Sequence, residues 1–141
     1  MSFQYDAILI TGASSGIGAA LARHFARTGV PLFISGRNQT RLQLVENDCR
    51  AAGANVYADV LDVTSRETMD AYVTHCDEIA QLSLVIANAG ISAGTGGLGE
   101  SPEQVRDIFA TNVAGVLNTI DPAIKVMRAR RRGQVALVAS Q

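Results

Sequence analysis

Three glycines in the segment TGASSGIG, residues 11–18, have the types and spacing of a loop that binds phosphate. Gly12 would permit a tight turn, Gly16 would let the backbone approach a pyrophosphate, and Gly18 would let a helix pack closely on a strand. The start of that helix would offer free N–H groups and the positive end of its dipole to the anion. The segment is not a P-loop, because no Gly-Lys-Ser/Thr sequence follows. The predicted cofactor contacts in the segment are Gly12, Ser14, Ser15, Gly16, Ile17 and Gly18.

The residues after the second apolar run, ISGRN at 34–38, bear on which dinucleotide would fit. Sites for NAD place an aspartate or glutamate there, which accepts hydrogen bonds from the ribose 2′-hydroxyl and would repel a 2′-phosphate. This segment has no acid and offers Arg37, whose guanidinium can bind phosphate bidentately. We therefore expect NADP(H) rather than NAD(H), with Ser14 and Asn38 assisting. If Arg37 only places a solvated charge at the strand end, the choice of cofactor stays open.

Strand-sized apolar runs alternate with helix-forming segments along the chain. The expected strands lie within residues 7–12, 31–36, 55–60, 82–90 and 134–140. Strands that alternate with helices pair in parallel through right-handed crossovers. We therefore predict one α/β domain over residues 1–141, a Rossmann-like doubly wound parallel sheet with helices on both faces. Ligands of such sheets bind beyond the carboxyl ends of the strands, where the glycine segment and Arg37 both lie.

Local signals predict how the helices begin, pack and end. They are an apolar face of Ile17, Leu21 and Phe25, a capping box from Thr64 to Glu67, a cap at Ser101 before Pro102 and Gln104, and a kink at Pro122. The basic run RARRRG, residues 128–133, would lie solvated in the last turn of a helix, where cations complement the dipole. Gly133 would then be the C-terminal cap.

Composition and charge restrict the class of protein. Of the 141 residues, 48% are hydrophobic and 18% are charged, as in one globular domain. A net charge of −1 gives no broad field that would attract nucleic acid or an anionic membrane, so we expect a small-molecule or protein partner. Cys49 and Cys76 lack the spacing of a metal site or a disulfide framework, and no targeting or membrane-spanning segment is evident. A reducing cytoplasm is therefore the expected compartment.

Taken in order, the motifs of this chain resemble those of the short-chain dehydrogenase/reductase family. They are TGASSGIG at 11–18, LDVT at 61–64, ANAG at 87–90, TNVAG at 111–115 and VALVAS at 135–140. The resemblance covers the whole chain and implies an NADPH-dependent oxidoreductase that transfers hydride between the nicotinamide and a carbonyl or alcohol substrate. It also implies that Asp62 contacts the adenine with Val63 beside the ring, and that Asn88, Ala89 and Gly90 shape the floor of the cofactor site.

The resemblance implies two catalytic positions and an oligomer. Asn112 would hold a water in the proton relay, and Ser140 would hydrogen-bond the reacting oxygen of the substrate. The long helix would form subunit contacts in a homodimer or homotetramer. Taken by themselves, Asp62 could be a residue before a helix cap, Asn112 a helix residue that faces solvent, and Ser140 a strand-end turn residue. The identity of the substrate is not indicated.

One motif of the family has no counterpart in this sequence, the Tyr-x-x-x-Lys that supplies its general acid after the fifth strand. Tyr5, Tyr57 and Tyr72 are the three tyrosines, and none has a lysine four residues on. We expect the amino-terminal part of a longer enzyme, with the sheet incomplete on its carboxyl-terminal side, because the last apolar strand would otherwise be an exposed edge. The alternative is a dinucleotide-binding module without turnover. A methyltransferase of similar fold is disfavoured by the missing acid after the second strand.

Overall fold

The computed structural model describes residues 4–92 and 99–139 as a single parallel sheet with helices on both faces. The strands are β1 (Ile8–Ile10), β2 (Leu32–Gly36), β3 (Val56–Val60), β4 (Leu84–Ala87) and β5 (Gln134–Leu137). Their order in the sheet is β3-β2-β1-β4-β5, and every neighbouring pair is parallel. The chain winds outward from β1 to β3 and then returns to place β4 on the other side of β1. This confirms the doubly wound fold and puts the switch point between β1 and β4.

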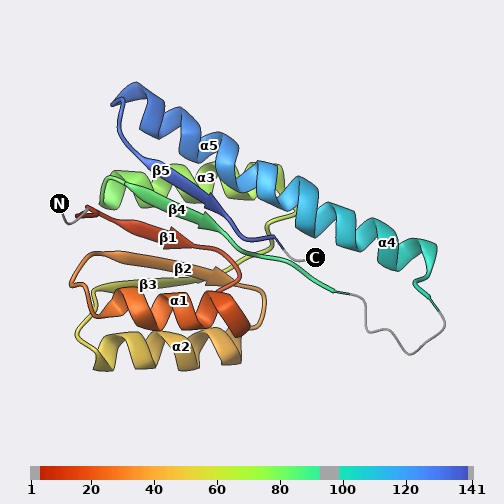
Figure 1. Cartoon of the computed structure of the whole chain (residues 1–141), viewed down its shortest axis with the longest axis horizontal. Helices are drawn as coiled ribbons and strands as arrows, with labels where there is room; N and C mark the ends of the chain where they lie inside the picture. Colours follow the sequence, from red (N-terminus) through yellow and green to blue (C-terminus); the bar gives the residue numbers. More distant parts are fainter. Residues whose placement is uncertain (1–3, 93–98, 140–141) are drawn as a thin grey trace.

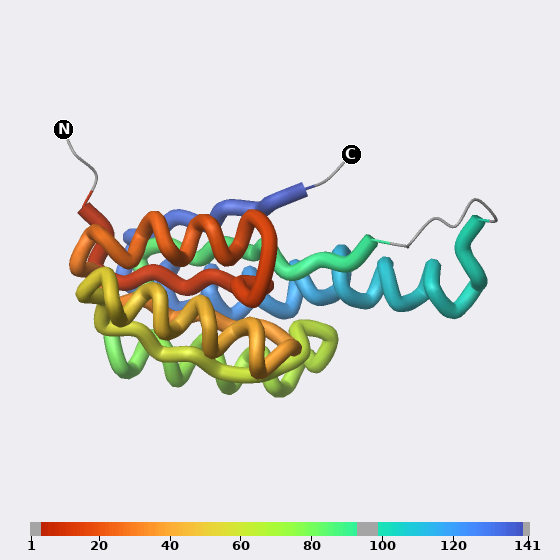
Figure 2. The backbone as a smooth tube through the Cα atoms, turned by 90° about the horizontal axis from the view of Figure 1, so that it is seen from below, coloured from red at the N-terminus to blue at the C-terminus, as the bar shows by residue number. Residues whose placement is uncertain are grey.

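The helices form two layers, with α1 and α2 on one face of the sheet and α3 and α5 on the other (Figure 1). They are α1 (Gly16–Ala26), α2 (Gln39–Ala51), α3 (Arg66–Ile79), α4 (Pro102–Phe109), the π-helical turn η1 (Ala110–Ala114) and α5 (Gly115–Ala129). The continuous rod of α4, η1 and α5 runs past the end of the sheet (Figure 2). No helix within the described residues combines the length and apolar character needed to cross a membrane.

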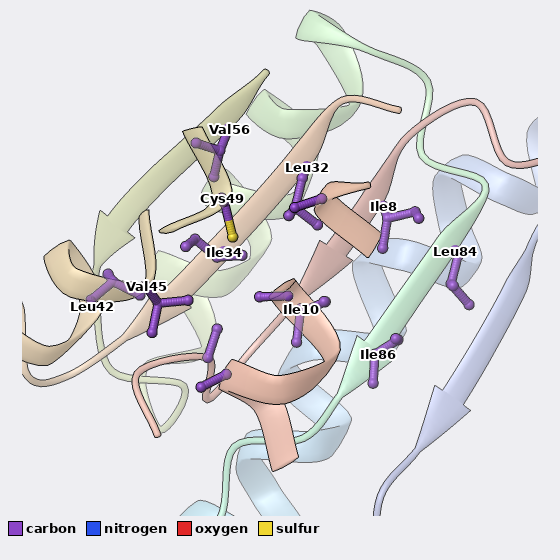
Figure 3. Close-up of a cluster of buried hydrophobic side chains, with 14 residues drawn as sticks. Ile8, Ile10, Leu32, Ile34, Leu42, Val45, Cys49, Val56, Leu84 and Ile86 are labelled. Atoms are coloured by element: carbon purple, nitrogen blue, oxygen red, sulfur yellow. The ribbon is translucent and has the colours of Figure 1, made fainter. Parts of the chain in front are cut away.

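The core lies on both faces of the central strands, because a parallel strand that is covered by helices on both sides buries every side chain. In β1, Ile8 and Ile10 pack toward α1 and α2, while Leu9 packs toward α3 and α5. Figure 3 shows the first of these clusters, with Leu32 and Ile34 of β2 beside the β1 isoleucines. Packing on both faces therefore sets where the strands end and where the turns at their carboxyl ends lie.

The most buried face of α1 consists of small residues and lies beside the predicted apolar face. Ala19, Ala22 and Ala26 are buried, whereas Ile17 is 61% exposed, and Leu21 and Phe25 are only partly buried. Small side chains on this face let the helix lie close to the sheet, so the larger residues fall at its margin.

The starts of α3 and α4 are capped by serines. Ser65, not Thr64, is the N-cap of α3, and its side chain accepts a hydrogen bond from the Thr68 N–H at 3.3 Å. The predicted box from Thr64 to Glu67 is therefore wrong by one residue, because the Thr64 N–H is already bonded to the carboxylate of Asp62. At α4 the predicted cap is confirmed, since Ser101 and Gln104 form a reciprocal capping box.

The carboxyl end of α5 also differs from the prediction. The C-cap is Arg130 rather than Gly133, and Arg131 follows in the left-handed region with φ 53°. The Arg132 N–H donates to the Met127 carbonyl at 3.2 Å, which closes a Schellman-type turn. The turn is thus made before the glycine is reached.

Arg130 is not a solvated helix-end charge, as the basic run was predicted to be. Its guanidinium pairs with the carboxylate of Asp77 on α3 and donates to the Leu82 carbonyl at 3.1 Å. The pair is mostly buried and ties α5 to α3 beside β4. Pro122, where a kink was expected, lies inside α5, which continues to Ala129, and the kink stays a prediction. A π-helical departure from α-helical hydrogen bonding occurs earlier on the same rod, in η1.

Candidate functional site

A cavity of about 970 Å³ opens at the carboxyl ends of the strands, next to the switch point between β1 and β4. Most of the predicted site residues border it. They are Gly12, Ser14, Ser15, Gly16, Ile17, Arg37, Asn38, Val63, Asn88, Ala89, Gly90 and Asn112. Gly18 and Asp62 are not among the lining residues, and Ser140 lies outside the described residues. The tertiary structure therefore brings together segments that are up to a hundred residues apart in the sequence.

The glycine turn after β1 has two glycines with different structural requirements. Gly12 has φ 64°, and a Cβ there would lie 2.6 Å from the Ala89 Cα, so the β1 and β4 turns meet at this residue. Gly16 has φ 58°, but a Cβ there would meet no protein atom within 4 Å. The first glycine is required by the fold, whereas the open space at the second is available to a ligand.

Gly18 explains why α1 can approach the turn so closely. A Cβ at this position would overlap the Gly12 carbonyl and the side-chain amide of Asn88. Gly18 therefore lets α1 pack closely against the turn after β1, as its predicted packing role requires, and it does not line the cavity.

Thr11 and Asn88 lock the turn after β1 to the turn after β4. The buried Thr11 Oγ1 accepts hydrogen bonds from the Asn88 N–H at 3.1 Å and the Ala89 N–H at 3.2 Å. In return, the Asn88 Nδ2 donates to the carbonyls of Thr11 at 3.3 Å and Gly12 at 3.1 Å. The sequence interpretation assigned Asn88 to the cofactor floor but did not single out Thr11, whose role depends on a partner strand.

Replacing Thr11 by valine should destabilise the protein by about 2 kcal/mol, because two backbone N–H groups lose their acceptor. The variant should also bind NADPH more weakly, since the two turns are no longer held together. Thr119→Val is the matched control: Thr119 is equally buried at 1% exposure, but its hydroxyl bonds within α5 to the Gly115 carbonyl at 2.8 Å. Chemical unfolding and an NADPH titration measure the two effects. Equal NADPH affinities in both variants would contradict the assigned role.

Positive charge gathers at the corner of the cavity where β2 ends and α2 begins. Arg37 and Arg41 both border the cavity there, and the first turn of α2 contains no acidic residue. The side chain of Asn38 is the N-cap of α2, because its Oδ1 accepts from the Arg41 N–H at 2.9 Å. Cations at a helix N-terminus are unfavourable unless an anion is present, so this corner fits a phosphate group.

Arg41 is the residue of this corner that sequence analysis missed. It lies at the third position of a helix, where an arginine looks like an ordinary surface residue. Its spacing of four from Arg37 is the signal that could have identified it, because α2 starts between the two. Ser14 borders the same corner: a Cβ on Gly36 would lie 3.0 Å from the Ser14 Cβ, so the glycine turn and the end of β2 are in close contact.

The turn after β3 is built around Asp62. Its Oδ1 accepts a hydrogen bond from the Thr64 N–H at 2.9 Å, which forms an Asx-type turn. Val63 is buried, at 5% exposure, and lines the cavity, whereas Asp62 is exposed beside it. One carboxylate oxygen of Asp62 is thus used for local structure.

Asn112 lies within the π-helical turn η1, where it faces the segment that follows β4. Its side chain forms two hydrogen bonds with the Ile91 backbone, accepting from the N–H and donating to the carbonyl, each at 2.8 Å. A side-chain amide retains one further N–H and one further lone pair. Asn112 therefore holds the segment after β4 in place. Its predicted part in a proton relay stays a prediction.

Two buried titratable groups of the described residues, Tyr72 and Cys76, lie away from the cavity. Burial raises the pKa of the Tyr72 hydroxyl well above its ordinary value and raises the pKa of the Cys76 thiol to about 12. Both stay protonated near neutral pH, and neither lines the cavity. Within the same residues no group of three or more potential metal ligands is found.

A parallel sheet of this order with a glycine turn at its switch point defines a dinucleotide-binding type of α/β domain. The chain belongs to the short-chain dehydrogenase family, whose model, described as short chain dehydrogenase, matches residues 6–141. The family expected from the order of the motifs is thereby confirmed.

Individual relatives agree with this assignment. An uncharacterized oxidoreductase of Myxococcus xanthus is 39% identical over 96% of this chain and 54% of its own length. An A-factor type gamma-butyrolactone 1'-reductase of Streptomyces virginiae is 37% identical over 89% of this chain and 49% of its own length. The chain spans about half the length of the curated relatives it matches.

Solved structures have the same fold. Actinorhodin polyketide ketoreductase, in a variant crystallised with NADPH, superimposes with a TM-score of 0.87 at 28% identity, covering 96% of this chain and 53% of that one. A metagenomic short-chain oxidoreductase in complex with NADP gives a TM-score of 0.88 at 25% identity, covering 96% and 62%.

Proposed function

We propose that this chain forms the cofactor-binding part of an NADPH-dependent reductase or dehydrogenase that interconverts a carbonyl and an alcohol. The observation that carries the proposal is one cavity at the switch point, bordered by both the open Gly16 turn and the Arg37 corner. These residues fit a dinucleotide, because the turn leaves space for a pyrophosphate and the corner has two arginines without an acidic side chain among the residues that line the cavity. Relatives named as reductases and structures with NADP or NADPH support it.

Each group of residues would have a separate task in binding the cofactor. The N–H groups at the start of α1 would bind the pyrophosphate, and Asp62 with Val63 would hold the adenine. Asn88, Ala89 and Gly90 would support the floor beneath the ribose and nicotinamide. The bound nicotinamide would supply or accept the hydride.

The proposed preference for NADP(H) over NAD(H) rests on charge. Arg37 and Arg41 at the N-terminus of α2 would bind the 2′-phosphate, with Ser14 and the N-capping Asn38 beside them. Neither an aspartate nor a glutamate occupies residues 34–38, so no carboxylate there would repel that phosphate.

The two proposed catalytic residues lie on different elements. Ser140 would hydrogen-bond the reacting oxygen of the substrate; the preceding Leu137, Val138 and Ala139 border the cavity. Asn112 would hold a water of the proton relay. Both assignments come from the family resemblance and stay predictions.

A second candidate is a module that binds the dinucleotide without turnover. Within the 141 residues of this chain no tyrosine is followed by a lysine at the fourth position, and these residues span about half the length of the curated relatives. The site described above would then bind NADPH while lacking a general acid.

One experiment separates these candidates. The protein is isolated as its source makes it, and its intact mass is compared with the 14.8 kDa of this chain. It is then titrated with NADPH, and oxidation of the bound cofactor is followed by absorbance with a panel of ketones, aldehydes and acyl thioesters. Binding with oxidation supports the enzyme, and binding without oxidation supports the second candidate. Absence of binding would contradict both.

Self-association is a further part of the proposal. An apolar stripe lies exposed along α4, η1 and α5, formed by Val105, Phe109, Val113 and Leu117. A second copy of the chain would cover it in a homodimer or homotetramer, and the molar mass in solution tests this.

The expected compartment stays a prediction. Cys49 and Cys76 are both buried free thiols, which is compatible with a reducing cytoplasm.

A further inference from the structure

The loop that joins β3 to α3, residues 61–65, is tied down at both ends by backbone hydrogen bonds. The Leu61 N–H donates to the Gly36 carbonyl at 3.1 Å, which fastens the loop to the end of β2. The Ser65 N–H donates to the Asp62 carbonyl at 3.3 Å and closes the turn before α3. The carbonyls of Val63 and Thr64 lie between these ties, and because Val63 is buried its carbonyl needs a donor from within the fold.

Asn118 on α5 supplies a donor to both of those carbonyls. Its Nδ2 donates to the Val63 carbonyl at 2.9 Å and to the Thr64 carbonyl at 3.3 Å. One turn earlier on the same helix, Gly115 lies against the Val63 side chain so closely that a Cβ would be 2.5 Å from its Cγ2. Helix α5 therefore contacts Val63 at two points. Gly115 packs against the Val63 side chain, and Asn118 hydrogen-bonds the Val63 carbonyl.

We propose that Asn118 is a positioning residue for recognition of the adenine half of the cofactor. The inference rests on the proposed function, because it takes Asp62 and Val63 as the adenine contacts. Asn118 itself does not line the cavity, so it acts through the loop. By holding the Val63 carbonyl, it fixes the buried Val63 at the cavity wall and keeps the neighbouring Asp62 at its edge.

The same rod of helix thus determines the position of two segments around one cavity. In η1, Asn112 bonds the Ile91 backbone, after β4; in α5, Asn118 bonds the loop after β3. The sheet order separates β3 from β4 by β2 and β1, so the sheet alone does not bring these two loops together. The continuous helix of η1 and α5 connects the two loops, because one of its asparagines bonds each of them.

The test compares Asn118→Leu with Thr119→Val by titration with two halves of the cofactor, 2′,5′-ADP and nicotinamide mononucleotide. Asn118→Leu should bind 2′,5′-ADP about five to ten times more weakly, the range expected when one loop-fixing hydrogen bond is lost. Its affinity for nicotinamide mononucleotide should not change. Thr119→Val removes a buried hydrogen bond from the same helix without touching the loop, so it should leave both affinities unchanged.

Two further variants and a second readout keep the test decisive. Asn118→Asp keeps the shape but replaces the donor by an oxygen, so it should weaken 2′,5′-ADP binding even if the leucine variant fails to fold. Asn118→Gln keeps the donor and should restore part of the affinity. Amide hydrogen exchange should become faster at residues 61–65 in Asn118→Leu and Asn118→Asp but not in Thr119→Val.

The outcomes separate this inference from the proposed function. If the unaltered protein does not bind 2′,5′-ADP, the proposed cofactor site is wrong and the inference is overturned with it. If the unaltered protein binds it and both donor-deleting variants bind it equally well, only the positioning role of Asn118 is overturned. Faster exchange in the loop with unchanged affinity would also overturn it.

Discussion

Replacing Gly16 by alanine should weaken NADPH binding by on the order of 100-fold, about 2.7 kcal/mol, while the protein stays folded. The alanine Cβ would meet no protein atom within 4 Å, so the fold has room for it. That same space is where the pyrophosphate would approach the backbone. The φ of 58° adds a cost of about 1–2 kcal/mol to the folded protein, because L-residues are strained in the left-handed region. A valine should abolish binding, but its branched Cβ would add more strain.

Gly29 offers a matched control for this substitution. It also has a positive φ, 75°, and a Cβ there would also meet no atom within 4 Å, but it lies outside the cavity. Gly29→Ala should therefore cost similar stability in thermal unfolding and leave the NADPH affinity unchanged. If the two variants bind NADPH equally well, the segment at residues 11–18 is only a turn between β1 and α1.

Replacing Arg37 by aspartate should lower the preference for NADPH over NADH by at least tenfold and up to about 100-fold, roughly 1.4 to 2.7 kcal/mol. Two effects act in the same direction. The 2′-phosphate would lose a charge-assisted partner and meet a like charge, while the 2′-hydroxyl of NADH would gain an acceptor. Arg41→Ala should give a smaller loss, because it removes one of the two cations of the corner without adding repulsion.

Arg66→Asp is the control for the change in net charge. Arg66 is the first residue of α3 and exposed, but it does not border the cavity. Its substitution makes the same change in total charge and should leave the ratio of NADPH to NADH dissociation constants unchanged. The ratio, measured by fluorescence titration of both cofactors, reports the local effect. An unchanged ratio in Arg37→Asp would overturn the assignment of the phosphate corner.

The parallel pairing of the strands and the position of the first turn could be predicted because their signals are local. Each apolar run is long enough for one buried strand, and alternation with helices restricts the pairing to parallel crossovers. The capping box at Ser101 was predicted correctly for the same reason, since a cap depends on residues within one turn. The predicted cap at Thr64 was wrong because the Asp62 carboxylate accepts the hydrogen bond of the Thr64 N–H, and Ser65 is the N-cap instead.

Side-chain roles that depend on a distant partner could not be predicted in this way. The run of arginines indicated a solvated helix end, yet Arg130 is mostly buried because Asp77 lies opposite it on α3. The periodicity of Ile17, Leu21 and Phe25 indicated an apolar face of α1, and Leu21 and Phe25 do pack against the core, but alanines form the most buried face. Both outcomes depend on contacts between elements that are far apart in the sequence.

The sequence by itself determined the fold class, the family and most residues that border the cavity, because strand-end turns carry short motifs whose geometry is encoded within a few residues. Only the tertiary structure decided which residues support those turns. Thr11 bonds the turn after β4, Arg41 comes to lie beside Arg37 at the cavity, and Asn118 fastens a loop that is more than fifty residues away in the chain. A hydrogen bond between distant segments depends on how the helices and strands pack, and no local pattern specifies that packing.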